Sequence, residues 1–184
     1  MKNIVIISSS IRNKSNSEIL ARQALQGALE SGNHAELITL KDKDIRFCKG
    51  CLACQKTMKC VIKDDVSEIL EKVKSADTIV FVTPIYYYEL SGQLKTLLDR
   101  LNPLYPQKYS FRDVYLMTTS AEEGDEVVET AVGGLKGWIA CFDKARFAGV
   151  FNGGGVNDAN EVSGREDMLK AAYEFGKSIE TPLS

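Results

Sequence analysis

The chain has 184 residues, 44% of them hydrophobic, which is enough for one compact domain with a sizeable core. Its 23 basic and 25 acidic side chains leave a formal net charge of −2, which excludes a general attraction to nucleic acid or acidic membranes. The apolar stretch at residues 4–7 is too short for a signal peptide, and no apolar run approaches the roughly 20 residues of a membrane span. We therefore expect a cytoplasmic protein.

Predicted strands and helices alternate along the chain. Short apolar runs predict five strands, at residues 3–7, 34–40, 78–82, 114–117 and 146–151. Apolar residues at helical spacing predict five helices, at residues 17–31, 65–75, 91–101, 126–142 and 166–179. Residues 41–63 are expected to be irregular, and Pro84 is expected to end the third strand.

This alternation predicts an α/β protein in which a parallel sheet carries helices on both faces. No repeat or linker interrupts it, so we expect one domain over residues 1–184. Ligands of such sheets bind outside the carboxyl ends of the strands. The candidate loops are therefore those at residues 8–17, 84–90 and 118–125, which follow the first, third and fourth strands.

The first of these loops is rich in serine and contains Arg12 and Lys14. Hydroxyls and backbone N–H groups at the N-terminus of a helix suit a dianionic phosphate. The loop contains no glycine, so it matches neither the dinucleotide fingerprint nor the Walker pattern. It predicts a mononucleotide phosphate site or, as the alternative, an ordinary polar turn with a helix cap.

The second loop is aromatic. Pro84-Ile85-Tyr86-Tyr87-Tyr88 follows the third strand directly, at an edge where aromatic side chains can flank a planar ring. The same tyrosines could instead cover a surface or an oligomer interface. A phosphate-binding loop beside them favours the binding of a ring.

Four of the five cysteines lie within 13 residues, with the spacing C-x2-C-x2-C-x5-C: Cys48, Cys51, Cys54 and Cys60. In a cytosolic chain such density indicates a metal site or redox chemistry more often than a disulfide framework. Four thiolates could hold an iron–sulfur cluster or a tetrahedral zinc ion, or the thiols could simply be reduced. Cys141 stands apart and is expected in the core of a helix.

Three motifs give the chain a specific resemblance. Ser9-Ser10-Ile11-Arg12 followed by Asn16-Ser17 is similar to a Gly-Ser-Pro-Arg…Asn-Thr loop, with Ser9 and Ile11 as departures. Pro84-Ile85-Tyr86 and Leu97-Leu98-Asp99-Arg100 match Pro-Ile-Tyr and Leu-x-Asp-Arg. The three family motifs are typical of the NADPH-dependent FMN reductase group of flavodoxin-like proteins. Residues 1 to about 120 of this chain resemble that group well.

The resemblance implies a flavodoxin-like three-layer sandwich whose five-stranded parallel sheet has the order 2-1-3-4-5, with helices on both faces, and which binds FMN. Around the phosphate it places Ser10, Arg12, Asn16 and Ser17. Along the isoalloxazine it places Pro84, Ile85, Tyr86 and Tyr87. At the polar edge of the ring, position in the fold suggests Thr118, Thr119 and Ser120.

The resemblance also implies an oxidoreductase that takes electrons from NAD(P)H and passes them to a flavin, quinone or similar acceptor. Because the flavin itself accepts hydride, no catalytic acid–base residue is expected. Relatives are usually dimers or tetramers, so we expect a homodimer or homotetramer with the cysteine-bearing segment and residues 87–90 as candidate contacts. A nucleotide-binding regulatory module without redox chemistry is an alternative that the fold does not exclude.

The cysteine spacing resembles a second group, the iron–sulfur flavoproteins, as does the Asp64-Asp65 pair that follows it. That resemblance implies a [4Fe–4S] cluster near FMN, with the four clustered cysteines, Cys48, Cys51, Cys54 and Cys60, as ligands. A cluster beside the flavin would favour one-electron transfer with a ferredoxin-like partner. Related reductases with a similar cysteine loop and no evident cluster leave the metal-free alternative open.

Overall fold

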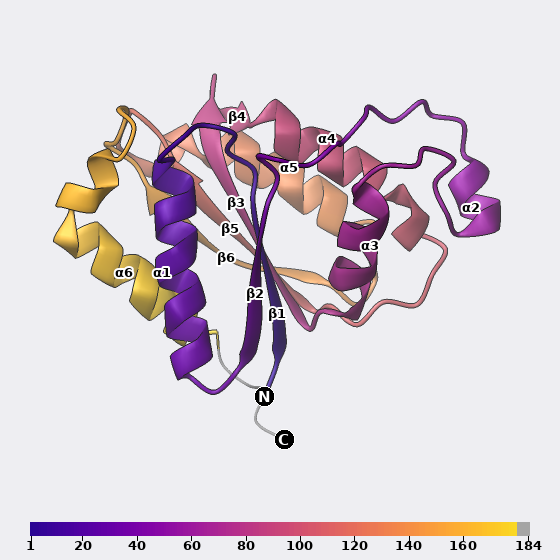
Figure 1. The fold of residues 1–184 in the computed structure, drawn as a ribbon, viewed down its shortest axis with the longest axis horizontal. Helices are drawn as coiled ribbons and strands as arrows, with labels where there is room; N and C mark the ends of the chain where they lie inside the picture. The colour runs from indigo at the N-terminus through magenta and orange to yellow at the C-terminus, as the bar shows by residue number, and fades with distance from the viewer. Residues whose placement is uncertain (180–184) are drawn as a thin grey trace.

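A computed structural model describes residues 1–179 and contains one mixed sheet (Figure 1). Its strands are β1 (Asn3–Ser8), β2 (His34–Thr39), β3 (Thr78–Tyr86), β4 (Glu89–Leu90), β5 (Asp113–Thr119) and β6 (Arg146–Gly153). Five of them run parallel in the order β2-β1-β3-β5-β6, which confirms the predicted parallel sheet and its order. The short β4 was not predicted and pairs antiparallel with β3.

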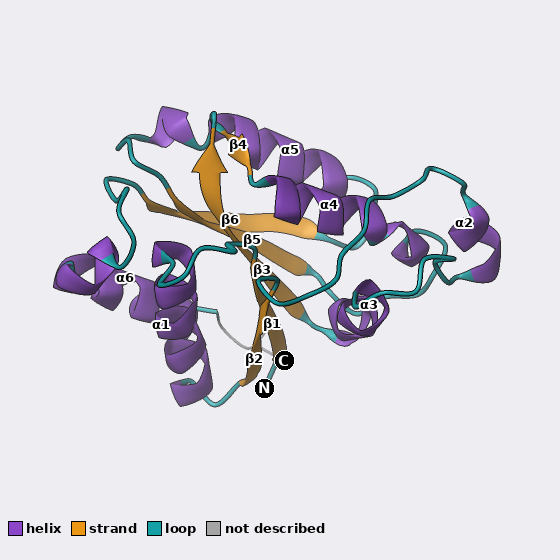
Figure 2. Ribbon diagram, turned by 45° about the horizontal axis from the view of Figure 1, so that its top comes forward, coloured by secondary structure: helices purple, strands orange, loops and turns teal. Residues whose placement is uncertain are grey.

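Helices cover both faces of the sheet (Figure 2). They are α1 (Asn16–Glu30), α2 (Ala53–Thr57), α3 (Val66–Ser75), α4 (Gly92–Arg100), α5 (Glu129–Ile139) and α6 (Glu166–Lys177), with 3₁₀ turns η1 (Asn102–Leu104), η2 (Asp125–Val127) and η3 (Glu161–Gly164). The buried side chains of α1 and α6 form one apolar cluster with the sheet, and those of α3, α4 and α5 form the other. No helix within residues 1–179 combines the length and apolar character needed to cross a membrane.

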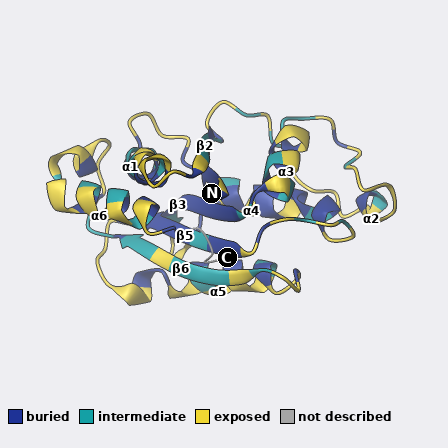
Figure 3. Ribbon diagram, turned by 90° about the horizontal axis from the view of Figure 1, so that it is seen from below, coloured by how far each residue is buried: buried dark blue, intermediate teal, exposed yellow. Residues whose placement is uncertain are grey.

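β1 explains why the central strands are apolar throughout. Val5 and Ile7 face the cluster beneath α3, α4 and α5, whereas Ile4 and Ile6 face the cluster beneath α1 and α6. Successive side chains of a strand point to opposite faces, so a strand covered on both sides needs apolar residues at every position. Figure 3 shows the result as buried central strands between helices whose outer faces are exposed, whereas the edge strand β6 is only partly buried.

The prediction that Pro84 ends the third strand is wrong. β3 continues to Tyr86, and Pro84 pairs in register with Thr119 of β5. The carbonyl of Val82 faces β1, where it accepts from Ser9 N, so Pro84 faces the same side two residues later. The pairing of β1 with β3 ends at Ser8 and Val82, so no β1 carbonyl lies opposite Pro84. The N–H that proline lacks therefore costs the sheet no hydrogen bond.

The long helix predicted at residues 126–142 is also shorter than expected. Asp125–Val127 forms a separate 3₁₀ turn, closed by a hydrogen bond from Val128 N to Asp125 O, and α5 then spans Glu129–Ile139. Cys141 therefore lies beyond the helix and is exposed, which corrects its prediction as a core residue.

Candidate functional site

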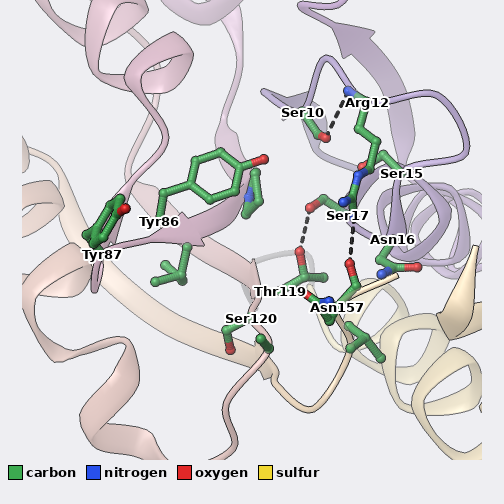
Figure 4. Close-up of a pocket in the computed structure, with 14 residues that line it drawn as sticks. Ser10, Arg12, Ser15, Asn16, Ser17, Tyr86, Tyr87, Thr119, Ser120 and Asn157 are labelled. Atoms are coloured by element: carbon green, nitrogen blue, oxygen red, sulfur yellow. Dashed lines mark hydrogen bonds between the residues drawn. The ribbon is translucent and has the colours of Figure 1, made fainter. Parts of the chain in front are cut away.

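A cavity of about 330 Å³ opens at the carboxyl edge of the sheet, where the loops after β1, β3, β5 and β6 meet (Figure 4). Ten of the eleven residues predicted to contact FMN line it: Ser10, Arg12, Asn16, Ser17, Pro84, Ile85, Tyr86, Tyr87, Thr119 and Ser120. The topology thus brings together three loops that are far apart in the sequence. Their role in binding FMN stays a prediction.

One end of the cavity is polar. Ser15 caps α1, because its hydroxyl accepts a hydrogen bond from Glu18 N at 3.3 Å. The hydroxyls of Ser17 and Thr119 lie 2.6 Å apart and join the first loop to β5. Arg12 adds a positive charge and is anchored by a 2.6 Å hydrogen bond from Nη1 to a backbone carbonyl. Hydroxyls, a cation and a helix N-terminus together suit a phosphate monoester.

The other end is formed by the β3–β4 hairpin. Its two-residue turn is Tyr87-Tyr88, and both residues have left-handed backbone angles, with φ of 51° and 64°. Residues other than glycine adopt this conformation at a cost of order 1 kcal/mol each, and such strain concentrates at functional sites. Tyr87 is fully exposed and Tyr86 is 53% exposed, so aromatic surface is free beside the cavity.

One side-chain contact fixes the hairpin against the loop after β5. The hydroxyl of Tyr88 donates a 2.7 Å hydrogen bond to Glu122 Oε2, and this carboxylate raises the pKa of Tyr88. The loop itself is held by Ser120, whose hydroxyl donates to Glu122 O at 2.9 Å. The hairpin end of the cavity therefore lies between two segments that are bonded to each other.

Two predicted residues of these loops lie outside the lining. Thr118 is fully buried, and its hydroxyl donates to the carbonyl of Phe151 at 3.3 Å. Because side chains alternate along β5, Thr119 rather than Thr118 faces the cavity. Lys14, expected to add charge near a phosphate, has a φ of 52° and is exposed outside the cavity.

The segment after β6 also lines the cavity through Val156 and Asn157, which the sequence analysis missed. It folds over the first loop: Asn16 Nδ2 donates to Asp158 O at 2.8 Å, and Val162 N donates to Asn16 Oδ1 at 3.1 Å. The carbonyl of Asn157 is also the anchor of Arg12. The signal was available, because the carboxyl end of a fifth parallel strand must lie at the same edge as the other four.

The four clustered cysteines lie on an excursion between β2 and α3, the cysteine loop (residues 47–63). Cys48 and Cys51 are exposed, Cys54 is buried in the short α2, and Cys60 is partly buried. Burial raises the pKa of Cys54, and its three neighbouring thiols raise it further. Within residues 1–179, no three or more His, Cys, Asp or Glu side chains are arranged to hold a metal ion.

The chemistry of this donor set nevertheless fits a cluster. Each thiolate of a [4Fe–4S] cluster binds a different iron, so four sulfurs need not converge on one point as the ligands of a single ion do. N–H groups already point at two of the sulfurs. Gly50 N donates to Cys48 Sγ, and Asn102 Nδ2 donates to Cys54 Sγ, each at 3.4 Å.

Comparison with known proteins identifies similarity both to FMN reductases and to iron–sulfur flavoproteins. A family model described as NADPH-dependent FMN reductase matches residues 2–143. An iron–sulfur flavoprotein of Methanocaldococcus jannaschii is 45% identical over 101 residues, which make up 55% of this chain and 52% of that protein. An iron–sulfur flavoprotein of Methanosarcina thermophila is 38% identical over 94 residues, 51% of this chain and 49% of that protein. The chain spans about half the length of these relatives.

A solved structure extends the likeness to nearly the whole chain. An NAD(P)H:quinone oxidoreductase from Methanothermobacter marburgensis superimposes with a TM-score of 0.72, covering 97% of this chain and 99% of that one. The two sequences are 17% identical, so this likeness establishes the fold alone. It confirms the predicted flavodoxin-like α/β architecture.

Proposed function

Because the chain belongs to the NADPH-dependent FMN reductase family, we propose that it is an FMN-dependent oxidoreductase that takes electrons from NAD(P)H and passes them to a flavin, quinone or similar acceptor. One observation carries the proposal: a single cavity has a hydroxyl-rich helix N-terminus at one end and an aromatic hairpin at the other. FMN combines a phosphate with a planar ring, and these two ends match it.

The residues of the polar end would bind the phosphate. Ser10 and Ser17 offer hydroxyls, and the first turn of α1 offers backbone N–H groups at the positive end of its dipole. Arg12, held on the carbonyl of Asn157, would offset the phosphate charge. The bonds that join Asn16 to the segment after β6 would keep this end closed to water.

The residues of the hairpin would orient the ring. Bound FMN would supply the hydride and electron chemistry, so the chain needs no nucleophile of its own. Ile85 and Tyr86 would lie along the ring, and Thr119 and Ser120 would offer hydroxyls to its polar edge. The exposed ring of Tyr87 leaves a surface on which the nicotinamide of NAD(P)H could stack.

The test is to purify the full chain without oxygen, record its visible spectrum, and titrate the flavin-free protein with FMN. We expect flavin absorbance, and its bleaching by NADPH or NADH with recovery when a quinone is added. Flavin binding without reaction with either nucleotide would contradict the use of NAD(P)H and favour an electron-transfer protein. A colourless protein that takes up no FMN would overturn the proposal and favour the regulatory-module alternative.

A second candidate function is electron transfer through an iron–sulfur cluster on the cysteine loop. Three observations favour it: the spacing of the four cysteines, the N–H groups directed at two of their sulfurs, and the relatives described as iron–sulfur flavoproteins. The ligands would be Cys48, Cys51, Cys54 and Cys60. Counting iron and sulfide on the anaerobic sample tests it: about four of each per chain is expected, and their absence after reconstitution would contradict it.

We propose further that residues 1–184 form a single FMN-binding domain of a cytoplasmic homodimer or homotetramer. The exposed aromatic surface of Tyr86 and Tyr87 beside the cavity supports a contact with a second copy there, as does the exposed Phe47 at the start of the cysteine loop. Light scattering on the purified chain tests the assembly. A monomer at all concentrations with full FMN affinity would contradict it.

A further inference from the structure

The cysteine loop is closed at its base by a buried ion pair. Nη1 and Nη2 of Arg100, the last residue of α4, donate to the two carboxylate oxygens of Asp64 at 2.6 and 2.9 Å, and both side chains are completely buried. Nη1 also donates to the carbonyl of Arg46 at 2.5 Å, and Arg46 N donates to Asp64 Oδ2 at 3.0 Å. One guanidinium therefore joins the two ends of the loop.

The same guanidinium lies near one cysteine of the loop, Cys60. Nε of Arg100 is buried and has no hydrogen-bond partner among residues 1–179. The Cys60 side chain lies near enough to interact with the charge of this guanidinium. A buried, unsatisfied donor beside a thiol indicates a place prepared for negative charge.

The residues that follow Arg100 support the tip of the loop. Asn102, in η1, donates from Nδ2 to the sulfur of Cys54 at 3.4 Å. Gln107 donates from Nε2 to the carbonyl of Met58 at 3.1 Å and to that of Pro103 at 2.8 Å. Asn102 and Gln107 thus contact the same loop in different ways, one at a sulfur and the other at the backbone.

We propose that Asn102 is a positioning residue for the sulfur of Cys54, and that its N–H stabilises the negative charge of a thiolate that binds an iron–sulfur cluster. This inference rests on the second candidate function. Hydrogen bonds to cluster sulfurs help to set reduction potential, because reduction adds negative charge that an N–H donor offsets. Losing the donor should therefore disfavour the reduced cluster while the loop still folds.

The test compares Asn102→Leu, which removes the donor at similar volume, with Gln107→Leu, which removes a donor to the backbone of the same loop. Full-length wild type and both variants are reconstituted with iron and sulfide without oxygen, and the iron content and midpoint potential of each are measured. We expect equal iron content in all three. For Asn102→Leu the ratio of reduced to oxidised cluster at a fixed potential should fall about tenfold, a shift of about −59 mV for a one-electron couple.

Gln107→Leu should change the ratio of reduced to oxidised cluster by no more than about twofold, because Gln107 contacts the backbone of the loop and no sulfur. Asn102→Asp should lower the potential further than Asn102→Leu, since a carboxylate oxygen replaces the N–H beside the sulfur. Equal shifts in Asn102→Leu and Gln107→Leu would overturn the proposal and leave Asn102 as a loop contact only. Absence of iron from the wild type would overturn the second candidate function and this inference with it, whereas a loaded wild type with an unshifted Asn102→Leu would overturn this inference alone.

Discussion

The FMN cavity and the cysteine loop are two candidate sites built in opposite ways. The cavity takes its lining from four loops at residues 10–17, 84–87, 119–121 and 156–157, which meet because parallel strands end at one edge of the sheet. The cysteine loop draws its four thiols from one stretch of chain that contains only the five-residue helix α2. Its shape depends on side chains from α4 and η1 rather than on the sheet.

This difference determines what each region tolerates. The cavity should survive changes in any one lining residue, since the sheet sets the position of every loop. The cysteine loop should depend strongly on a few polar contacts, above all on the guanidinium that joins its two ends. Five predictions test that contrast.

The largest effect is expected from Arg100→Met. Removing one partner of a buried ion pair leaves the Asp64 carboxylate uncompensated, and such changes cost about 3–5 kcal/mol. Denaturant unfolding of the variant should show a loss of this size in the free energy of unfolding. The matched control is Lys95→Met on the same helix, whose ion pair with Asp99 is exposed, and it should change stability by less than about 1 kcal/mol.

The same ion pair predicts a pH dependence. Burial alone would raise the pKa of Asp64, but hydrogen bonds from Arg100 and from the backbone of Arg46 lower this pKa overall. The contribution of Asp64 to stability is therefore complete above the ordinary carboxyl pKa of about 3.9 and is lost as the pH falls through the lower folded-state value. The stability difference between wild type and Asp64→Asn should shrink in that acidic range, and a difference that stays constant down to the acid limit would contradict the assignment.

The second largest effect is expected from Arg12→Ala on FMN affinity. A charge-assisted hydrogen bond contributes about 1.5–3 kcal/mol, so the Kd for FMN should rise about ten- to hundredfold. Lys14→Ala is the control, because Lys14 has the same charge in the same loop but does not line the cavity. Flavin fluorescence titrations measure both, and equal losses would mean that general charge rather than a placed guanidinium attracts the phosphate.

A smaller effect is expected from Gly154→Ala, which tests the segment after β6. A Cβ on Gly154 would lie 2.6 Å from the carbonyl oxygen of Glu122, so the loop after β5 must shift. Overpacking of this kind costs about 1–3 kcal/mol of stability, and the FMN Kd should rise in parallel. Gly164→Ala meets no atom within 4 Å and should leave both quantities unchanged. An unchanged FMN Kd in Gly154→Ala would separate this segment from the site.

The same contrast separates the parts of the fold that could be predicted from the sequence from those that could not. Five parallel strands and three of the loops around the cavity were predictable, because apolar runs such as residues 3–7 and 78–82 encode buried strands locally. The order of the strands followed from the family resemblance and not from these runs. The β3–β4 hairpin was missed because Pro84 indicates a strand end, and only the early end of β1 makes proline acceptable there. That information lies in the pairing of strands and not in the segment itself.

The contacts of the cysteine loop were beyond prediction for a different reason. The spacing of the cysteines identified candidate ligands, and the Leu-x-Asp-Arg motif was noted only as a family resemblance. The partners of these residues depend on side-chain contacts across 36 residues between Asp64 and Arg100, and across 48 between Cys54 and Asn102. No periodicity in the sequence specifies such pairs.

The smallest effect is expected from Tyr88→Phe, which sharpens the comparison at the hairpin. The lost hydrogen bond to Glu122 is exposed, and exposed charged contacts contribute little, so the FMN Kd should rise by only about twofold. Tyr87→Phe, with no such bond among the described contacts, should have no effect on FMN titrations. If Tyr88→Phe instead reduced affinity as much as Arg12→Ala, the hairpin would depend on one side-chain contact as the cysteine loop does. The strand pairing of β3 with β4 would then not be sufficient to hold the ring-binding end of the cavity.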